Sequence, residues 1–232
     1  MSECEIMKVL PLILAAVSAS MPVVFQKTGL SEKYGFKMKM LCAFSYIVTG
    51  AVSAFSVYKV TAYSLVILTA LLLGALGDFF LEYKRKKFFS VGVLFFAFGH
   101  IAYSFCFLCI GAYKALPHIL TVIFFTAVLT LAVVILALTK IKLEGKKKLL
   151  LIYVPILIFA FACAFFSGVY AVRAGNLSYG LCLISGGILF FLSDIMIGIG
   201  KGGIQRPEFL HNAVSYTYFA AQTLFALSIY FQ

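Results

Sequence analysis

Long apolar runs, separated by short stretches with charged residues, glycine or proline, follow one another along the whole chain. Each run is close to the roughly 20 residues that a helix needs to cross a bilayer. The runs are continuous, whereas a strand of an outer-membrane barrel alternates apolar and polar positions. The pattern therefore predicts an all-α fold, a polytopic membrane protein built as a bundle of eight transmembrane helices. The predicted spans are 8–25, 40–58, 60–82, 88–110, 116–139, 149–172, 177–199 and 209–231.

The composition agrees with this interpretation and excludes an ordinary soluble domain. Hydrophobic residues make up 63% of the 232 residues and charged residues only 12%, whereas a soluble domain carries roughly a quarter charged residues. Eight spans of about 20 residues leave about 72 positions for the termini and seven connections, so we expect a single membrane domain over 1–232. The first run follows an acidic start and lacks a convincing cleavage site, which favours a retained helix over a signal peptide. We expect a multi-pass protein of the cell membrane.

The basic residues are concentrated in every second connection. Fifteen of the 19 Lys and Arg residues follow the first, third, fifth and seventh runs, and the other side receives one at a time. The positive-inside rule then places these connections in the cytoplasm and both termini on the extracytoplasmic side. The orientation of the helices in the membrane thus explains the net charge of +11. We expect no nucleic acid partner, since the sequence has no polar domain in which basic and aromatic residues alternate. The fifteen are Lys27, Lys33, Lys37, Lys39, Lys84, Arg85, Lys86, Lys87, Lys140, Lys142, Lys146, Lys147, Lys148, Lys201 and Arg206.

The six cysteines indicate neither a disulfide framework nor a metal site. Five of them are scattered within apolar runs, and Cys106 and Cys109 form the only C-x-x-C pair, which supplies half of a tetrahedral site. We therefore expect no metal and no organic cofactor. The sequence does not indicate an oligomeric state.

Two aspartates lie inside apolar runs, and they are the only aspartates in the chain. Asp78 precedes the Lys84–Lys87 cluster by six residues and Asp194 precedes Lys201 by seven, about 9–10 Å along a helix from each basic end. An ionised Asp near the middle of a span costs roughly 2.5–3.5 kcal/mol, so each one implies a polar partner, a hydrated pocket or a function. Two carboxyls at one depth could act as an acid and base pair if their helices face each other, because both would not ionise easily. The alternative is that each merely fixes helix packing.

Four further polar residues in the spans are candidates for the lining of a pocket. His100 and Tyr103 are three residues apart and share a helical face, and so do Tyr218 and Gln222, which are four apart. Each of these residues is also compatible with a packing or interfacial role.

The predicted cytoplasmic end offers groups for an anionic headgroup. Lys27 at the end of the first span, and His211 and Asn212 at the start of the last, fall on that side. Glu82 lies four residues after Asp78, on its face, and also precedes Lys86 by four, the favourable order for a helical ion pair. Lys27 is equally explained as one of the basic residues that set the orientation of the helices in the membrane.

A weak internal repeat relates the two halves of the chain. The offset between Asp78 and Asp194 is 116, half of 232, and each follows a small residue near the end of its span. Four helices per half would preserve orientation, so a parallel 4+4 repeat, 1–115 and 116–232, fits the pattern.

The stretches LLLGALGDFFLE (71–82), FAFGHIAYS (96–104), FFLSDIMIG (190–198) and YTYFAAQTLFALS (216–228) resemble the YhhN-like lysoplasmalogenase family. The resemblance covers nearly the full length, including the eight-helix layout. It implies a membrane-embedded hydrolase that cleaves the vinyl ether bond of lysoplasmalogens to a fatty aldehyde and a glycerophospho-headgroup. On that resemblance, Asp78 and Asp194 take the catalytic positions. The substrate-binding candidates are then His100, Tyr103, Tyr218, Gln222, Lys27, Glu82, His211 and Asn212.

The residues suit this chemistry, since protonation of the alkene carbon followed by water addition needs an acid and a base but no cofactor. We expect a lysophospholipid substrate and membrane lipids as partners. Two other classes stay open: a proton-coupled transporter or lipid-binding membrane protein, and, with a poorer fit to motif and spacing, an intramembrane aspartyl protease.

Overall fold

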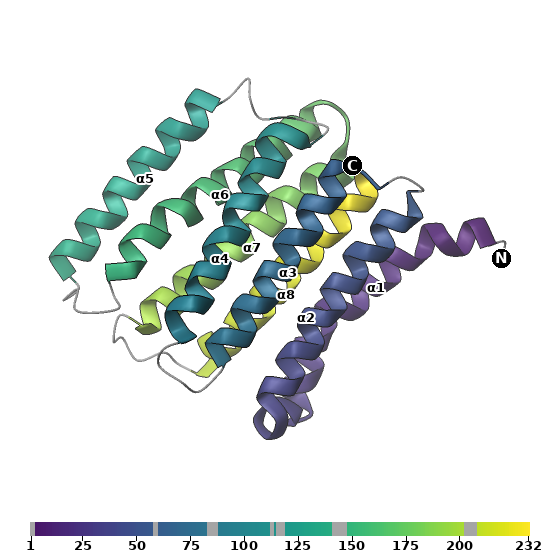
Figure 1. The fold of residues 1–232 in the computed structure, drawn as a ribbon, viewed down its shortest axis with the longest axis horizontal. Helices are drawn as coiled ribbons and strands as arrows, with labels where there is room; N and C mark the ends of the chain where they lie inside the picture. The colour runs from purple at the N-terminus through teal and green to yellow at the C-terminus, as the bar shows by residue number, and fades with distance from the viewer. Residues whose placement is uncertain are drawn as a thin grey trace.

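Eight α-helices and one short π-helix make up the fold (Figure 1). The computed structural model describes residues 3–57, 60–82, 88–111, 114, 119–140, 148–201 and 208–232, and these residues contain no strand. The predicted all-α fold with eight helices is confirmed. The elements are α1 (Glu3–Lys27), α2 (Leu30–Ser56), α3 (Ala62–Glu82), α4 (Phe88–Phe105), η1 (Cys106–Ile110), α5 (Ile119–Lys140), α6 (Lys148–Arg173), α7 (Leu177–Lys201) and α8 (Glu208–Phe231).

Six helices are long and apolar enough to cross a membrane, judged on the described residues. They are Lys8–Lys27, Leu30–Ser56, Ala62–Glu82, Phe88–Ile110, Ile152–Arg173 and Leu177–Ile197. The helix α5 contributes a shorter apolar stretch, Ile119–Val134. The remaining helix, α8, carries a row of Tyr, Thr, Gln and Ser residues, several of which are buried against its neighbours.

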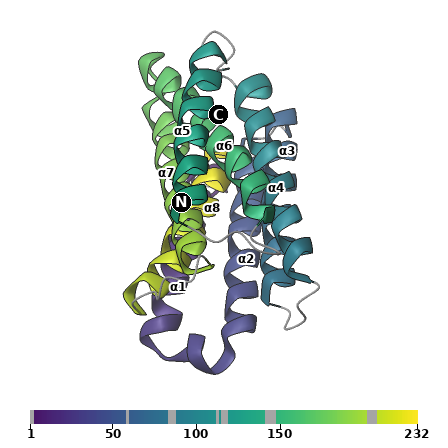
Figure 2. The ribbon, with the colours of Figure 1, turned by 90° about the vertical axis from the view of Figure 1, so that its left-hand side faces the viewer.

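The second helix begins ten residues earlier than the apolar run at 40–58 predicts. Gly29 adopts a left-handed conformation (φ 70°), which only glycine adopts without strain, and this allows α1 and α2 to meet in a tight turn. The segment from 30 to 39 is helical, with a local break at Tyr34 (φ −131°). Lys33, Lys37 and Lys39 therefore belong to α2, which corrects their assignment to a loop. The α1–α2 hairpin extends beyond the ends of the other helices (Figures 1 and 2).

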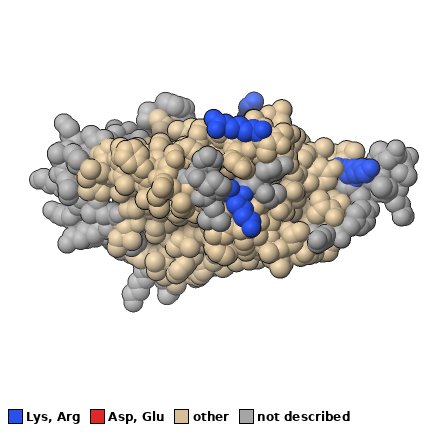
Figure 3. All heavy atoms as spheres, turned by 90° about the horizontal axis from the view of Figure 1, so that it is seen from above, with Lys and Arg blue, Asp and Glu red and all other residues tan. Residues whose placement is uncertain are grey.

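The helices run up and down, so that the odd-numbered connections share one end of the bundle. Figure 1 shows the C-terminal ends of α1, α3, α5 and α7 on that side. On the other side, Lys114 and Arg173 are exposed. Figure 3 views this second end and shows separate basic side chains and, among the described residues, no acidic one. Successive helices thus run in opposite directions, as the predicted spans require. The side of the membrane on which the two termini lie stays a prediction.

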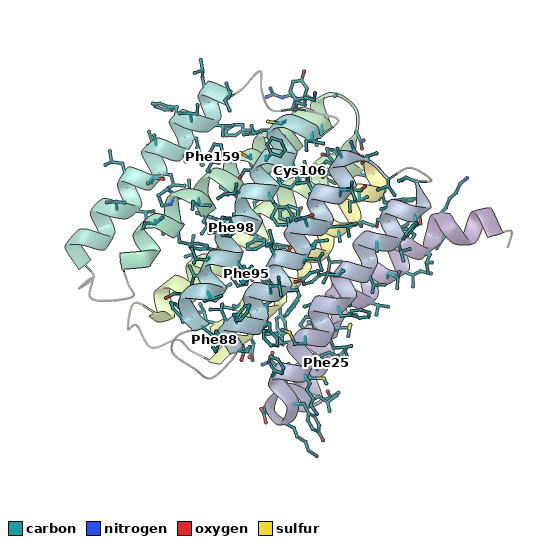
Figure 4. The ribbon with its side chains drawn as sticks, in the orientation of Figure 1. Phe25, Phe88, Phe95, Phe98, Cys106 and Phe159 are labelled. Carbon is teal, nitrogen blue, oxygen red and sulfur yellow. The ribbon has the colours of Figure 1, made fainter. Side chains whose placement is uncertain are left out.

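The helix α8 lies at the centre of the packing. It contacts α1, α2, α3 and α7, whereas α5 packs mainly on α6 and lies at the edge of the bundle (Figure 1). Aromatic side chains fill much of the space between helices, and others point outward, as Figure 4 shows. Phe95 stacks on Phe80 with ring centroids 5.3 Å apart, while Phe98 is 56% exposed and would face lipid.

Candidate active site

Asp78 is buried in the bundle and forms an ion pair with a lysine from the neighbouring helix. The Lys39 Nζ atom on α2 lies 3.1 Å from Asp78 Oδ1 and 3.1 Å from Glu82 Oε1, both on α3. Asp78 and Glu82 are four residues apart, so one ammonium group reaches both carboxylates from a single helical face. The Asp78 side chain is 3% exposed, whereas Lys39 and Glu82 are 26% and 43% exposed. The ion pair therefore reaches from the interior toward the end of the bundle.

The second oxygen of Asp78 is buried without a hydrogen-bond partner among the described residues. The Tyr218 hydroxyl on α8 is close enough to act on this carboxyl, although it does not meet hydrogen-bond geometry at Oδ2. A buried acceptor without a donor is costly, so this oxygen is suited to accept a hydrogen bond from a water molecule or a ligand.

A hydrogen-bonded chain of three side chains joins α4 to α8 beside Asp78. Tyr103 donates from its hydroxyl to Gln222 Oε1 at 2.6 Å, and Gln222 Nε2 donates to the Tyr218 hydroxyl at 3.1 Å. All three side chains are buried. Gly74 makes this arrangement possible, since a Cβ atom at that position would lie 2.5 Å from Gln222 Nε2. The predicted shared face of Tyr218 and Gln222 is thus confirmed.

Asp194 on α7 lies in a second polar cluster, with His100 from α4 and Tyr153 from α6. Tyr153 donates a short hydrogen bond to Asp194 Oδ2, and His100 Nε2 lies 3.2 Å from the same oxygen. The Tyr153 hydroxyl is also 2.9 Å from His100 Nε2, so the three polar atoms contact one another mutually. The side chains of His100 and Asp194 are 3% and 7% exposed. The expectation that each intramembrane Asp needs a polar partner holds at both positions.

Aromatic rings lie between the two clusters. The Phe190 ring centroid is 4.6 Å from that of His100 and 5.5 Å from that of Tyr218. Among the described residues, no hydrogen bond or ion pair joins Asp78 to Asp194, so each carboxyl has its own set of partners. The two clusters share a wall of side chains from α4, α7 and α8.

A small cavity of about 10 Å³ adjoins this wall, enough for about one water molecule. Its polar lining residues are His100 and Tyr103, which confirms that they share a helical face. Its other lining residues are Phe107, Leu157, Ala160, Phe161, Gly187, Phe190, Phe191 and Phe225. Water, the second reactant of a hydrolysis, could therefore reach the interior next to an imidazole ring.

The predicted headgroup residues lie apart from these clusters or beyond what the structure describes. Lys27 is exposed at the end of α1, and Asn212 is partly buried near the start of α8. The side chain of His211 lies outside the described residues, and so does Lys86, the predicted partner of Glu82. Glu82 is paired with Lys39, and the predicted pair with Lys86 stays a prediction. The described residues hold no group of three or more His, Cys, Asp or Glu side chains that could bind a metal ion.

Two residues that contact the aspartates, Lys39 and Tyr153, escaped the sequence analysis. Lys39 was counted among the loop charges, because it directly precedes the apolar run that begins at 40. Tyr153 lies five residues after Lys148, near the start of its predicted span, where a tyrosine is common at the membrane interface. Its one signal is that a buried tyrosine needs a partner for its hydroxyl.

Comparison with known proteins gives one match. A family model described as the YhhN family matches residues 32–229. No curated protein and no solved structure matches the chain. The matched range contains both aspartates with Lys39, His100 and Tyr153, while Lys27 lies outside it.

Proposed function

Because the chain belongs to the YhhN family, the lysoplasmalogenase family, we propose that it hydrolyses the vinyl ether bond of lysoplasmalogens. The products would be a fatty aldehyde and a glycerophospho-headgroup. The observation that carries this proposal is the pair of aspartates inside the bundle, each in its own polar cluster, with Phe190 in contact with a residue beside each cluster.

The reaction needs one proton donor and one anionic group. Protonation of the alkene carbon leaves a positive charge shared between the adjacent carbon and the ether oxygen. The Asp78 carboxylate, which Lys39 binds through Oδ1 while Oδ2 stays free of donors, is suited to stabilise that cation. The Asp194 cluster contains titratable O–H and N–H groups and is suited to move the proton.

A single-chain amphiphile fits the surroundings of the site. Its tail would lie among the phenylalanines of η1, α6, α7 and α8, and its headgroup at the basic end of the bundle, near Lys39 and Glu82. We propose entry from the lipid between helices, with the substrate drawn from the cytoplasmic leaflet of the cell membrane.

The test is release of aldehyde from a lysoplasmalogen by the purified protein in detergent. We expect Asp78→Asn and Asp194→Asn each to lower turnover by about 100- to 10,000-fold, the usual contribution of a general acid or base. A lysolipid with an ester in place of the vinyl ether serves as the control substrate. Substantial activity in both folded variants would refute the roles of the two aspartates.

A different class of function is also testable in the same preparation. A proton-coupled transporter or lipid-binding protein would bind the lysolipid without forming aldehyde. An intramembrane protease would cleave a helical peptide and leave the lysolipid intact. Binding without product from well-folded protein would shift the proposal to transport or lipid binding.

A further inference from the structure

His100 occupies a position that a mechanism based on two carboxyls alone leaves unexplained. Its ring is 3% exposed, it belongs to the Asp194 cluster through Nε2, and it lines the water-sized cavity. Within the part of the chain that the structure describes, it is therefore the one titratable side chain that touches both an aspartate and the place where a water molecule fits.

The contacts in this cluster suit one arrangement of protons when Asp194 is ionised. Tyr153 then donates its hydrogen to Asp194 Oδ2, and His100 Nε2, 3.2 Å from the same oxygen, carries a hydrogen that it also donates there. The same N–H points toward the Tyr153 oxygen at 2.9 Å. When Nε2 donates to a carboxylate in this way, the other ring nitrogen, Nδ1, is the one that can exchange a proton with a reactant.

We propose that His100 is the catalytic acid and base of the hydrolysis, and that Asp194 and Tyr153 are positioning residues that orient its ring. The inference rests on the proposed function and assigns the proton transfer within it. Asp194 holds Nε2–H and stabilises the charged ring, and Tyr153 holds Asp194. Asp78, in the other polar cluster, stabilises the cation formed from the substrate.

The proton is returned within one cycle. The charged imidazole gives its Nδ1 proton to the alkene carbon, the electrons of the double bond form the new C–H bond, and the adjacent carbon becomes the cation. The oxygen of water then forms a bond to that carbon, and one of its protons goes to Nδ1, which restores the charged ring. The resulting hemiacetal loses its C–O bond to the glycerol oxygen, which takes the hydroxyl proton, and the aldehyde is released. One water is consumed and no other reactant is needed.

The test is chemical rescue in the full-length protein. We expect His100→Ala to lower aldehyde release by about 100- to 10,000-fold, and added imidazole to restore part of it with saturation, because the base then occupies the space of the missing ring. Leu157→Ala enlarges the same cavity without removing a titratable group, so imidazole should not accelerate this variant. Asp194→Asn keeps the ring and should not respond to imidazole either.

His100→Gln keeps a donor for Asp194 and tests the role if His100→Ala does not fold. Turnover within about tenfold of wild type in folded His100→Gln would overturn the inference. An inactive, folded His100→Ala that imidazole leaves inactive would also overturn it. These outcomes presuppose aldehyde from the wild-type protein; its absence would instead refute the proposed function.

Discussion

Asp78 is held by a lysine that reaches it from another helix, and this contact has both a structural and a functional consequence. The Lys39 ammonium lies 3.1 Å from each of two carboxylates, and the side chain of Asp78 is almost fully buried. Removal of one partner of a buried pair leaves an uncompensated charge, which costs more than the pair itself contributes.

Lys39→Met should therefore lower the free energy of unfolding by about 1–3 kcal/mol. Breaking a fully buried ion pair costs roughly 3–5 kcal/mol, and the loss here should be smaller because Lys39 is 26% exposed. Lys39→Arg keeps the charge and should retain most of the stability. Thermal unfolding in detergent, followed by circular dichroism, measures both. Equal losses in the two variants would show that the size of the side chain matters, and not its charge.

Gly74 makes room for the hydrogen-bonded chain beside Asp78. Gly74→Ala should displace Gln222 and break its bond to Tyr218, since the new Cβ would lie 2.5 Å from Gln222 Nε2 and 3.2 Å from the Tyr218 oxygen. We expect a loss of about 1–3 kcal/mol in stability together with a fall in aldehyde release. Gly35→Ala is the control, because nothing lies within 4 Å of a Cβ there. Unchanged activity in Gly74→Ala would mean that Gln222 and Tyr218 need not be held in place.

At the scale of elements, polar side chains connect helices that are far apart in the chain. Ser18 on α1 bonds to Ser45 on α2 at 2.8 Å and to Thr223 on α8 at 2.9 Å. In a bilayer such hydrogen bonds hold helices together, because lipid is as apolar as the side chains that surround them. This contact explains how the first helix, which lies outside the matched family range, docks on the central helix α8.

Thr223→Val should weaken the contact between α1 and α8 and lower the free energy of unfolding by about 0.6 kcal/mol, the average for hydrogen bonds between membrane helices. The loss should not exceed about 1.7 kcal/mol, the largest value for such bonds. Unfolding in mixed micelles of mild detergent and dodecyl sulfate gives the difference. Thr69→Val is the matched control, since Thr69 is exposed and bonds only to Leu65 within its own helix. A control loss as large as that of Thr223→Val would contradict the interhelical role.

At the scale of the whole molecule, one helix pairing recurs in the two halves of the chain, while the parallel 4+4 repeat stays a prediction. The second helix of each half packs on the fourth helix of the other half, α2 on α8 and α6 on α4. Each aspartate then receives one partner from the second helix of its own half and one from the fourth helix of the other. For Asp78, Lys39 forms the ion pair and Tyr218 is the nearby hydroxyl, and for Asp194 the partners are Tyr153 and His100.

The orientation in the membrane gives a prediction for the whole chain. Cysteines introduced at Lys33 and Lys37 should be protected from a membrane-impermeant maleimide in intact cells, and cysteines at Lys114 and Arg173 should react. The reason is that the connections rich in Lys and Arg stay in the cytoplasm. The labelling is read against a background in which accessible native cysteines have been replaced. The reverse pattern would place the site on the opposite leaflet.

The sequence by itself determined the class of fold and the position of nearly every helix. Long apolar runs can only be helical in a bilayer, where each backbone group must be bonded within its own segment, so the spans could be located without any knowledge of their contacts. The prediction was wrong at the start of α2, because charged residues there continue the helix beyond the apolar run. Asp78 and Asp194 were found for the same reason, since the cost of a carboxyl in an apolar helix makes it conspicuous.

Only the tertiary structure decided which side chains meet these aspartates. Lys39 is 39 residues from Asp78, and Tyr153 is 41 residues from Asp194, so their contacts depend on how each helix is rotated and which neighbour it packs against. Hydropathy carries no information on that rotation when a helix is apolar on nearly all sides. The cavity beside His100 and the aromatic wall between the two clusters likewise exist only after four helices have packed together.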